Sequence, residues 1–440
     1  MEMIHLTCDV LVIGGGVAGV AAAVAAARTG AHTILAEASD MLGGTATAGL
    51  NCSFEGVNTA LMGGINAEII DRLRIRNAVI LGEYAPFSSE DFQQICFELL
   101  EEAGVQLLFG ISAIGVQKSR EKVVGVDFYT KGGPLRITSH SFVDASGDGD
   151  IAFLAGAPYE LGDLETGEIQ PVSILFRMGN VRVYDVLSYV QQTPSQFHHE
   201  KLLFACDPTL TPPLMVANGF FDWVRHCKNQ GMDLGRDAFA IINTPHPGEV
   251  LINATRLGQI NALDPLSRSE ALIKLRQQVY SLVGYLKSEM PGFSDSYVID
   301  IAPSLGVRET RRIKGLYQLT AEDIINGREF KDCIARNFFP IDIHGPKSNP
   351  GGYQWILPGG KGVYDIPLRC LIPMNAHQLF LAGRCISSTH QAHGSTRTMP
   401  CCIATGQAAG VSAALSKTCN SLETLTSIVQ ETLRKQGVMI

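Results

Sequence analysis

Residues Asp9–Glu37 read DVLVIGGGVAGVAAAVAAARTGAHTILAE, and this stretch decides the fold of the chain. Val10–Ile13 is a continuous apolar run of the kind required by a strand that is buried on both faces. The run leads into a G-x-G-x-x-G, in which Gly14 turns the chain, Gly16 leaves room for a pyrophosphate, and Gly19 lets a helix pack closely. The order predicts a parallel strand, a phosphate-binding turn and a helix.

The second half of the stretch completes a dinucleotide-binding unit. Val17–Thr29 is nearly all alanine and valine, which predicts a buried helix whose N–H groups face the phosphates and which Gly30 ends. Thr33–Ala36 follows as a second strand, and Glu37 lies 18 positions after Gly19, where a carboxylate accepts hydrogen bonds from both ribose hydroxyls. No arginine stands directly behind Glu37, which argues against a 2′-phosphate and hence against NADP. We therefore predict a bound adenine dinucleotide without that phosphate.

The same stretch has a second interpretation as a targeting segment. Val10–Ala27 is an apolar run of about the length of a signal peptide or a membrane span. Met1–Asp9 contains no lysine or arginine, however, and three consecutive glycines would weaken a spanning helix. We therefore expect no signal sequence and no membrane span, and the reducing cytoplasm is the expected location.

Composition and charge narrow the classes of partner. The 440 residues are 46% hydrophobic and 18% charged, which is typical of a soluble globular enzyme with one large core or two domains. A net charge of −8 without a basic block argues against nucleic acid and anionic membranes. Eleven cysteines include no C-x-x-C and no zinc-like spacing, so we predict no disulfide scaffold, redox dithiol or metal site. The expected partner is a small-molecule substrate, and an assembly of identical copies is compatible with the sequence.

The chain up to Asp150 alternates predicted helices and strands. Residues 40–49 are rich in glycine and small side chains, as backbone lying against a ligand requires. Predicted helices cover Gly64–Asn77 and the region from Ser88 to Gly104, and predicted strands cover Val105–Phe109, Ile111–Val116, Val123–Tyr129, Leu135–Ser139 and Phe142–Asp144. The second, third and fourth of these strands form a small antiparallel meander. Ala145–Asp150 is a second glycine-rich turn after a strand, where an open α/β sheet binds its ligand.

The middle and the end of the chain differ in character. The region from Pro158 to Asp300 is rich in prolines and turns, carries no second glycine fingerprint and contains one long predicted helix, Leu263–Met290. We interpret it as a domain that caps the substrate. Leu379–Ala382 predicts a buried strand, Ile386–Thr398 a polar loop, and the small residues that follow predict a helix to about Leu415. Both ends of the chain should therefore contribute to the dinucleotide site.

With these pieces placed, the chain resembles the FAD-dependent oxidoreductase family within the glutathione-reductase-like flavoprotein superfamily. Fumarate reductase flavoproteins and thiazole synthase are more distant relatives. The resemblance is carried by DVLVIGGGVAG, LGGTATAG, DASGDGD, PSLGVRETRRI, YDIPLRCLIP and LAGRCISSTHQAHGSTRTMPCCIATGQAAG. These stretches cover both ends of the chain and little of its middle third. The resemblance implies FAD and redox chemistry without implying a substrate, and fumarate-reductase-type substrate motifs are not evident.

The resemblance also implies a fold, domain boundaries and cofactor contacts. The fold class is α/β: a Rossmann-like FAD-binding domain with a central parallel sheet and a small meander, formed by residues 1–157 and 366–440, and an inserted α+β substrate domain of residues 158–365. The implied cofactor-binding residues are Gly14, Gly16, Val17, Ala18, Gly19, Glu37, Ala38, Gly43, Gly44, Thr45, Ala113, Ile114, Ala145, Ser146, Gly147, Asp148, Gly383, Arg384, Met399 and Cys402. Of these, Ala113 or Ile114 should meet the adenine through backbone, and the last four should approach the flavin ring.

Three residues are candidates for catalysis: His390, Arg397 and Arg308. A histidine that titrates near neutrality suits removal of a substrate proton, and a guanidinium offers a bidentate fork for a carboxylate or an alkoxide-like oxygen. Each candidate has a structural alternative, because a loop histidine can be held by hydrogen bonds alone and a charge cluster is usually solvated or ion-paired. Weaker candidates are His393, His344 and Arg369.

The predicted activity is that of an FAD-dependent oxidoreductase transferring a hydride between a small organic substrate and flavin N5. Flavin reductases that use NAD(P)H usually carry a second dinucleotide-binding domain in mid-chain. We therefore expect electrons to pass to a small acceptor or a protein rather than to a bound nicotinamide. Two alternatives stay open: a thiazole-synthase-like protein that uses a dinucleotide, and a non-catalytic flavin-binding protein. The large middle segment counts against the first, and the polar loop His390–Arg397 counts against the second.

Overall fold

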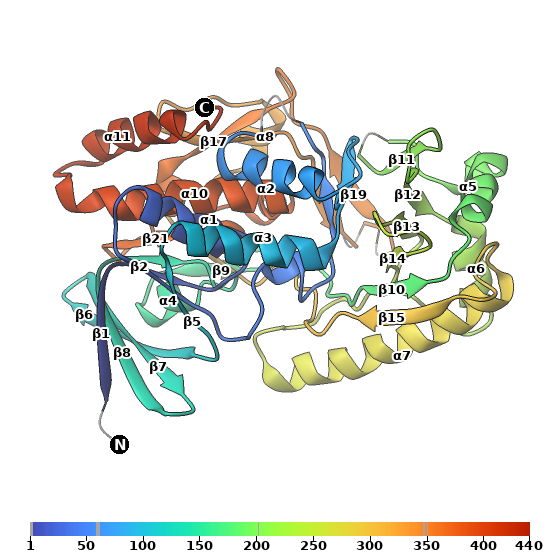
Figure 1. Ribbon diagram of the computed structural model, residues 1–440, viewed down its shortest axis with the longest axis horizontal. Helices are drawn as coiled ribbons and strands as arrows, with labels where there is room; N and C mark the ends of the chain where they lie inside the picture. The colour runs from blue at the N-terminus through green and yellow to red at the C-terminus, as the bar shows by residue number, and fades with distance from the viewer. Residues whose placement is uncertain (1–2, 59–61, 201, 346–347, 350) are drawn as a thin grey trace.

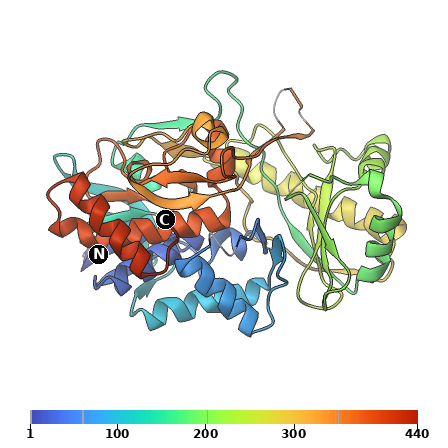
Figure 2. The same cartoon turned by 90° about the horizontal axis from the view of Figure 1, so that it is seen from above.

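The protein is described by a computed structural model that covers residues 3–58, 62–200, 202–345, 348–349 and 351–440 (Figure 1). Two main sheets lie beside each other along the long axis of the molecule. The helices from the two ends of the chain gather around the first sheet, and those of the middle segment gather around the second (Figure 2). No helix among the described residues is long and apolar enough to cross a membrane.

The larger sheet has seven strands in the order β5-β2-β1-β8-β7-β6, with β21 also paired to β8. Its strands are β1 (Ile4–Ile13), β2 (Thr33–Ala36), β5 (Gln106–Leu108), β6 (Ser112–Ser119), β7 (Lys122–Thr130), β8 (Gly133–Asp144) and β21 (Leu379–Leu381). The pairs among β5, β2, β1, β8 and β21 are parallel, and β6, β7 and β8 form an antiparallel meander. The α/β fold class is confirmed.

One strand differs from the sequence prediction. The last meander strand and the strand that returns to the parallel sheet are a single strand, β8. The polar run at Ser139–Ser141 suggested a break, but β1 pairs along its whole length, with Cys8 opposite Ser139 and Val10 opposite Ser141. Ser141 is fully buried, and its hydroxyl is satisfied by the hydroxyl of Ser416 at 2.7 Å.

Helix α1 (Val17–Arg28) and helix α10 (Met399–Leu415) cross in close contact and join the two ends of the chain. Two glycines of α10 make the contact, because a Cβ at Gly406 would lie 2.1 Å from the carbonyl oxygen of Ala18. A Cβ at Gly410 would lie 2.0 Å from the carbonyl oxygen of Ala22. The alanine-rich face of α1 is therefore matched by glycines, and no side chain separates the two backbones.

Further helices complete this half of the molecule. They are α2 (Gly64–Ile75), α3 (Ser89–Glu102), α4 (Asp150–Leu154), α8 (Ala321–Ile325) and α11 (Leu422–Lys435). The Ser88 hydroxyl accepts from the Asp91 N–H to cap α3, and Ser421 caps α11 in the same way at Thr424. The predicted starts of α2 and α3 agree with these bounds to within one residue.

The second sheet is antiparallel, with six strands in the order β11-β12-β13-β14-β10-β15. Its strands are β10 (Phe176–Gly179), β11 (Phe204–Asp207), β12 (Leu214–Gly219), β13 (Phe239–Asn243), β14 (Val250–Asn253) and β15 (Tyr297–Ile301), and its helices are α5 (Val183–Gln192), α6 (Phe221–Asn229) and α7 (Pro265–Glu289). Helix α7 is the long helix expected from the sequence. Asp264 caps it, and it buries a stripe from Ala271 to Leu286 at helical spacing.

Four two-stranded sheets connect the main parts: β3 (Ser53–Glu55) with β4 (Tyr84–Pro86), β9 (Tyr159–Leu161) with β16 (Arg311–Ile313), β17 (Cys333–Asn337) with β20 (Tyr364–Pro367), and β18 (Ile341–His344) with β19 (Tyr353–Ile356). Short 3₁₀ turns lie at Gly44–Ala46, Pro194–Gln196, Leu368–Leu371, Gly383–Cys385 and Ser416–Thr418. The prediction of a polar loop over Ile386–Thr398 was wrong in its second half, which forms helix α9 (His390–Thr396). Thr389 caps this helix, and α9 packs on β18, so a polar sequence is buried there.

Candidate active site

The first part of the site is a turn of bare backbone between β1 and α1. Gly14 has a φ of +100°, a conformation that favours glycine, and its N–H donates to the carbonyl of Ala36 at 2.8 Å. A Cβ at Gly19 would lie 1.7 Å from the carbonyl oxygen of Gly14, which fixes how closely the helix approaches the turn. A Cβ at Gly16 would meet no protein atom within 4 Å, because this glycine faces open space. That space is available to a ligand.

A second glycine loop lies against the first. Gly43 forms a bridge with Gly16, and a Cβ on Gly44 would lie 3.0 Å from the Cα of Gly16. Both Gly43 and Gly44 have positive φ, so the loop depends on glycine for its shape as well as for its closeness. The third glycine turn, after β8, is held by Asp144. Its carboxylate accepts from the Ala152 N–H at 2.9 Å and from the Ser146 hydroxyl.

Burial affects the protonation of Asp144, the carboxyl group that holds this third turn. Because Asp144 is fully buried, its pKa is raised to about 6, although the hydrogen bonds from Ser146 and Ala152 oppose that shift. Beside it, Arg384 donates to the carbonyl of Gly147 at 2.9 Å, to the carboxylate of Asp148, and to the carbonyl of Val307. Arg384 therefore joins the third glycine turn to the segment around Val307, which carries the second half of the site.

Two helix N-termini enter the same cavity without a side-chain cap. Neither Gly16, which precedes α1, nor Thr398, which precedes α10, supplies a capping side chain, whereas α3, α7 and α11 all have one. The free N–H groups and the positive dipole end of each helix favour negative charge on a ligand. Val17 and Ala18 line the cavity at the first end, and Met399 and Cys402 line it at the second. The two ends match a pyrophosphate and the polar edge of a flavin.

The cavity has a volume of about 1000 Å³ and brings most of the sequence-predicted cofactor residues together. It is lined by Gly14, Gly16, Val17, Ala18, Glu37, Ala38, Gly44, Thr45, Ala145, Ser146, Gly147, Asp148, Gly383, Arg384, Met399 and Cys402. Gly19 and Gly43 shape the turns from behind. Ala113 and Ile114 lie on β6 and do not line it, and Ile114 is 60% exposed. Their contact with adenine stays a prediction.

The carboxylate of Glu37 is partly engaged by its own neighbours. It accepts hydrogen bonds from the N–H of Gly15 and from the N–H and hydroxyl of Ser39, the last two at 2.7 Å. An ionised carboxylate offers about four acceptor positions, so capacity remains for a ribose hydroxyl. The three glycine turns, the acid and the two open helix ends fit an FAD.

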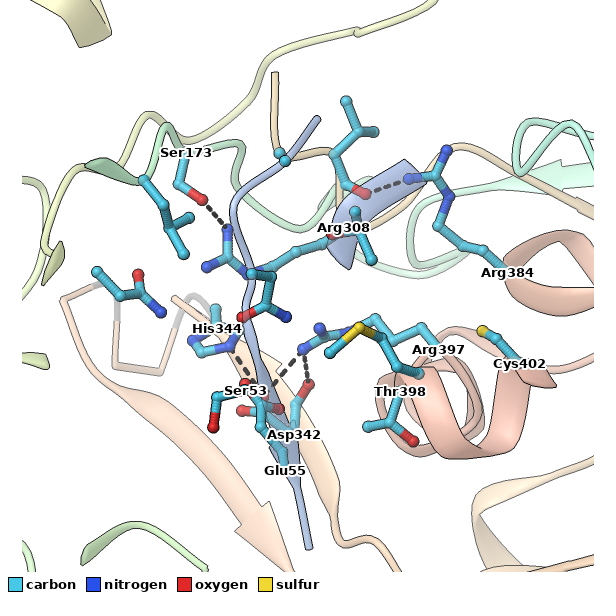
Figure 3. Close-up of a pocket in the computed structure, with 18 of the residues that line it drawn as sticks. Ser53, Glu55, Ser173, Arg308, Asp342, His344, Arg384, Arg397, Thr398 and Cys402 are labelled. Atoms are coloured by element: carbon cyan, nitrogen blue, oxygen red, sulfur yellow. Dashed lines mark hydrogen bonds and ion pairs between the residues drawn. The ribbon is translucent and has the colours of Figure 1, made fainter. Parts of the chain in front are cut away.

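Beyond the glycine turns, the cavity continues into a chamber of charged side chains (Figure 3). Asp342 of β18 accepts from Arg397 at 2.9 Å and from the Nε2–H of His344 at 2.8 Å. Arg308 donates to the carbonyl of Pro171 at 2.8 Å and to the Ser173 hydroxyl at 3.2 Å. The chamber therefore contains Arg308 and Arg397, two of the three catalytic candidates.

The charges of this cluster are coupled. Burial would raise the pKa of Asp342, but its interaction with His344 and the charges of Arg397 and Arg308 outweigh burial, and the pKa falls well below its usual range. Burial lowers the pKa of His344 well below its usual value, with help from Arg308 and against the attraction of Asp342. His344 is thus a neutral imidazole: Nε2 donates to Asp342, and Nδ1 accepts from Arg256 at 3.0 Å. Both ring nitrogens are occupied.

The charged chamber residues that were not found from the sequence include Asp342, Arg236, Arg256 and Glu55. Each is a single charged residue in or next to a strand, without a motif around it, and only its place on the cavity wall marks it. The carboxylate of Glu55 forms no hydrogen bond or ion pair with another described residue, and burial raises its pKa against the opposing charges of Arg397 and Arg308. A desolvated carboxyl without a partner in a cavity wall is suited to proton transfer.

His390 does not line this cavity. It lies on α9, only 6% exposed, and its Nδ1 is 3.0 Å from the carboxylate of Glu309, which also pairs with the buried Arg312. His393 is fully buried, and its Nε2 donates to the carbonyl of Arg384 at 3.1 Å. These histidines lie behind the part of the cavity wall that Arg384 forms. Of the three candidate histidines from the sequence, His344, which ranked as a weaker candidate, lines the cavity.

Solved structures are similar to this chain at low sequence identity. The flavin-dependent brominase Bmp2 matches with a TM-score of 0.52 and 11% identity, over 97% of this chain and 83% of that one. A geranylgeranyl bacteriochlorophyll reductase-like protein from Thermoplasma acidophilum matches with a TM-score of 0.47 and 12% identity, over 99% of this chain and 85% of that one. THI4 from Thermovibrio ammonificans matches with a TM-score of 0.28 and 21% identity, over 36% of this chain and 67% of that one.

The family comparison covers nearly the whole chain. No protein among curated sequences matches it. The model of the family described as FAD dependent oxidoreductase matches residues 9–435, a span that contains all three glycine turns, the chamber and α10. The cofactor is FAD, and the protein is an enzyme of the redox class. The chain belongs to the FAD-dependent oxidoreductase family.

Proposed function

We propose that this enzyme transfers a hydride between a small organic substrate bound in the chamber and the flavin, with a proton exchanged through Glu55. Bound FAD supplies the two-electron acceptor or donor. One observation carries the proposal: a single cavity joins the glycine turns to an unpaired carboxyl and a set of guanidinium groups. The three glycine turns, Val17, Ala18 and Glu37 would hold the cofactor, and Met399 and Cys402 would lie beside its ring.

Glu55 replaces His390 as the proton-transferring group in this proposal. Removal of a hydride from a C–H bond beside an oxygen or nitrogen requires removal of the O–H or N–H proton. A carboxylate oxygen of Glu55 would accept that proton, or return it in the reverse direction. Because its pKa is raised, the group takes up a proton more readily than an exposed glutamate.

His344 and Asp342 are positioning residues in this scheme. Neutral His344 has both nitrogens engaged, and ionised Asp342 holds Arg397 by an ion pair of 2.9 Å. The pair therefore fixes a guanidinium at the chamber wall beside the N-terminus of α10, where Thr398 follows Arg397 directly. A fixed guanidinium orients a substrate oxygen, and the guanidinium does not transfer its own proton.

The source and destination of the electrons follow from the middle segment. Its described residues form an antiparallel sheet with α7 and carry no glycine turn after a parallel strand, which is the element that a second dinucleotide-binding domain would supply. We expect a small acceptor or another protein to exchange electrons with the flavin.

The test is the visible spectrum of the purified enzyme under anaerobic conditions. The expected result is a flavin band that NADH leaves intact and that a substrate from a screen of alcohols, amines and hydroxy acids bleaches. Rapid bleaching by NADH would refute the proposed electron route. A protein that cannot be loaded with FAD would refute hydride transfer as its function.

A further inference from the structure

We propose that the chamber binds an organic acid with two carboxylates, held by Arg236, Arg256 and Arg308. This deepens the proposed function, on which it rests for the role of the acid as substrate. The proposal starts from a difference among the buried arginines. Arg177, Arg236, Arg256 and Arg312 are each less than 9% exposed, and they fall into two pairs.

The first pair follows the general rule for buried charge. Arg177 is 5% exposed and pairs with Glu90, Glu249 and Asp300, and Arg312 is 1% exposed and pairs with Glu160 and Glu309. Removing a guanidinium from water costs several kcal/mol unless carboxylates and hydrogen bonds replace the lost hydration. Away from the cavity, this protein provides that compensation.

The second pair breaks the rule, and both members line the cavity. Arg236 is 8% exposed and donates only to the backbone and side-chain oxygens of Asn253, at 3.0 and 3.1 Å. Arg256 is 4% exposed and donates to two glycine carbonyls and to neutral His344. The Nε–H of each has no partner among the described residues, and neither forms an ion pair with them. Arg308 likewise donates only to neutral oxygens.

The cations act on one another in the absence of a ligand. Burial and the charges of Arg256 and Arg308 lower the pKa of Arg236 well below its usual value. Burial lowers the pKa of Arg256 to about 10, and burial together with Arg397 and Arg256 lowers that of Arg308 to about 9. A guanidinium stays protonated at ordinary pH, so these shifts express the free-energy cost of uncompensated positive charge. A bound anion would relieve that cost.

The carboxylates of the chamber do not suffice to balance the charge. Asp342 is engaged by Arg397 and His344, and the raised pKa of Glu55 disfavours its charged form. The lining residues Glu200 and Asp237 are exposed at the edge of the cavity and form no ion pair with the three arginines. None of the three guanidinium groups forms an ion pair with a described carboxylate, and the one carboxylate whose charge acts on all three, Asp342, is already engaged by Arg397 and His344. This favours a ligand with two negative charges over a ligand with one.

Other unsatisfied groups face the same space. The Nε1–H of Trp355, the Oδ1 of Asn218 and the Oγ of Ser53 are buried and have no hydrogen-bond partner in the described part of the chain, and their residues line the cavity. Buried polar groups without partners are rare in folded proteins, and each costs free energy until a ligand or water satisfies it. Together with the arginines they provide both donors and an acceptor, as an acid with an additional hydroxyl or amide requires.

The first experiment uses the FAD-loaded enzyme and does not depend on turnover. Malonate, glutarate and adipate are titrated while the flavin absorption spectrum and the melting temperature are recorded, with butyrate as the single-charge probe and glutaramide as the neutral probe. We expect at least one diacid to bind about tenfold or more tightly than butyrate, and glutaramide not to bind. Binding of glutaramide or butyrate as tightly as the best diacid would overturn the proposal.

The second experiment uses two leucine variants with opposite expected effects on stability. Arg236→Leu should raise the melting temperature of the ligand-free enzyme, because an uncompensated cation is removed, and should abolish the effect of the diacid. Arg312→Leu should lower the melting temperature, because Glu309 and Glu160 lose their partner. Arg225→Gln, at a side chain that is 71% exposed, is the neutral control.

The outcomes separate this inference from the proposed function. An enzyme whose flavin is bleached only by neutral alcohols or amines, and which binds no diacid, retains the function and refutes the inference. An enzyme that binds diacids through Arg236, yet whose flavin no substrate reduces, retains the anion site and refutes hydride transfer. Diacid binding that is unchanged in Arg236→Leu would overturn the assignment of the site.

Discussion

The two ends of the cavity are built on different principles. The cofactor end consists of backbone: glycine turns with no side chain in the way and two helix N-termini without caps. The chamber consists of charged side chains. They come from β3 and β18, from the segments before β13 and after β14, and from the segments before α10 and β16. Steric space therefore decides which side chains the cofactor end can contain, and charge decides which side chains the chamber can contain.

This difference determines what a mutation can do at each end. At the cofactor end, an added carbon atom strikes neighbouring protein atoms or occupies the ligand's place, whatever its polarity. In the chamber, side chains of the same size but different charge change the function, because charges without partners dominate its energetics. Predictions for the two ends therefore use different variants, and each one tests the distinction.

The largest effect is expected where backbone meets backbone. Gly410→Ala places a Cβ 2.0 Å from the carbonyl of Ala22, so α10 must move away from α1. We expect a loss of about 1–3 kcal/mol or more in the free energy of unfolding, measured by denaturant titration. Gly284 lies inside α7 with no atom near its Cβ position, so Gly284→Ala should stabilise by up to about 1 kcal/mol. Equal effects at the two glycines would contradict the proposed close crossing.

The next effect separates cofactor binding from folding. Gly16→Val adds a side chain that meets no protein atom at Cβ, at a φ of −68° that valine tolerates. The ligand-free protein should melt within about 2 °C of the parent, since no native contact is strained. FAD content after purification, read from the flavin absorption, should fall by about tenfold or more because the side chain occupies the pyrophosphate position. Normal FAD content would place the cofactor elsewhere.

The same difference explains which features could be predicted from the sequence. The cofactor end is encoded in contiguous runs, since a strand, a glycine turn and a helix must follow one another to form it. The bounds of β2 and the start of α10 were accordingly predicted from local pattern alone. The whole G-x-G-x-x-G unit follows from steric requirements that a short stretch can satisfy.

The chamber could not be predicted in this way. Glu55, Arg236 and Arg256 are far apart in sequence, and what unites them is that β3 and the segments before β13 and after β14 line one cavity. His390 was favoured because it stands in a conspicuous polar run, but that run folds into α9 and turns His390 toward Glu309. Local composition predicts where a ligand's backbone contacts lie. It does not predict which single side chains a tertiary contact brings to the ligand.

A third prediction tests Glu55 through the pH dependence of the reaction. If its carboxylate accepts the substrate proton, the rate of flavin reduction should rise with pH through its pKa, which lies above that of an exposed glutamate. Glu55→Gln should lower this rate by about 10²–10⁴-fold and remove that rise. It should leave FAD content unchanged. Stopped-flow measurement of flavin reduction across pH checks this, and an unchanged profile in the variant would exclude Glu55 as the base.

Binding of a diacid provides a second test of the protonation of Glu55. Negative charge on the ligand disfavours the ionised form of Glu55, so binding should weaken as pH rises through its pKa. Glu55→Gln should bind the diacid at least as tightly as the parent and should show no such weakening. Stronger binding by the parent at high pH would contradict a raised pKa at this position.

The smallest effect on catalysis is expected at His390. His390→Leu removes a hydrogen bond of 3.0 Å to Glu309, which keeps its contacts with Arg312 and with the N–H of Gln170. The free energy of unfolding should fall by about 1–3 kcal/mol, as for other buried hydrogen bonds of charged groups. The rate of flavin reduction should stay within about threefold of the parent, because His390 does not line the cavity. A tenfold loss of rate at unchanged stability would return the proton-transferring role to His390, the residue that the sequence first suggested, and Glu55 would then be a structural carboxyl.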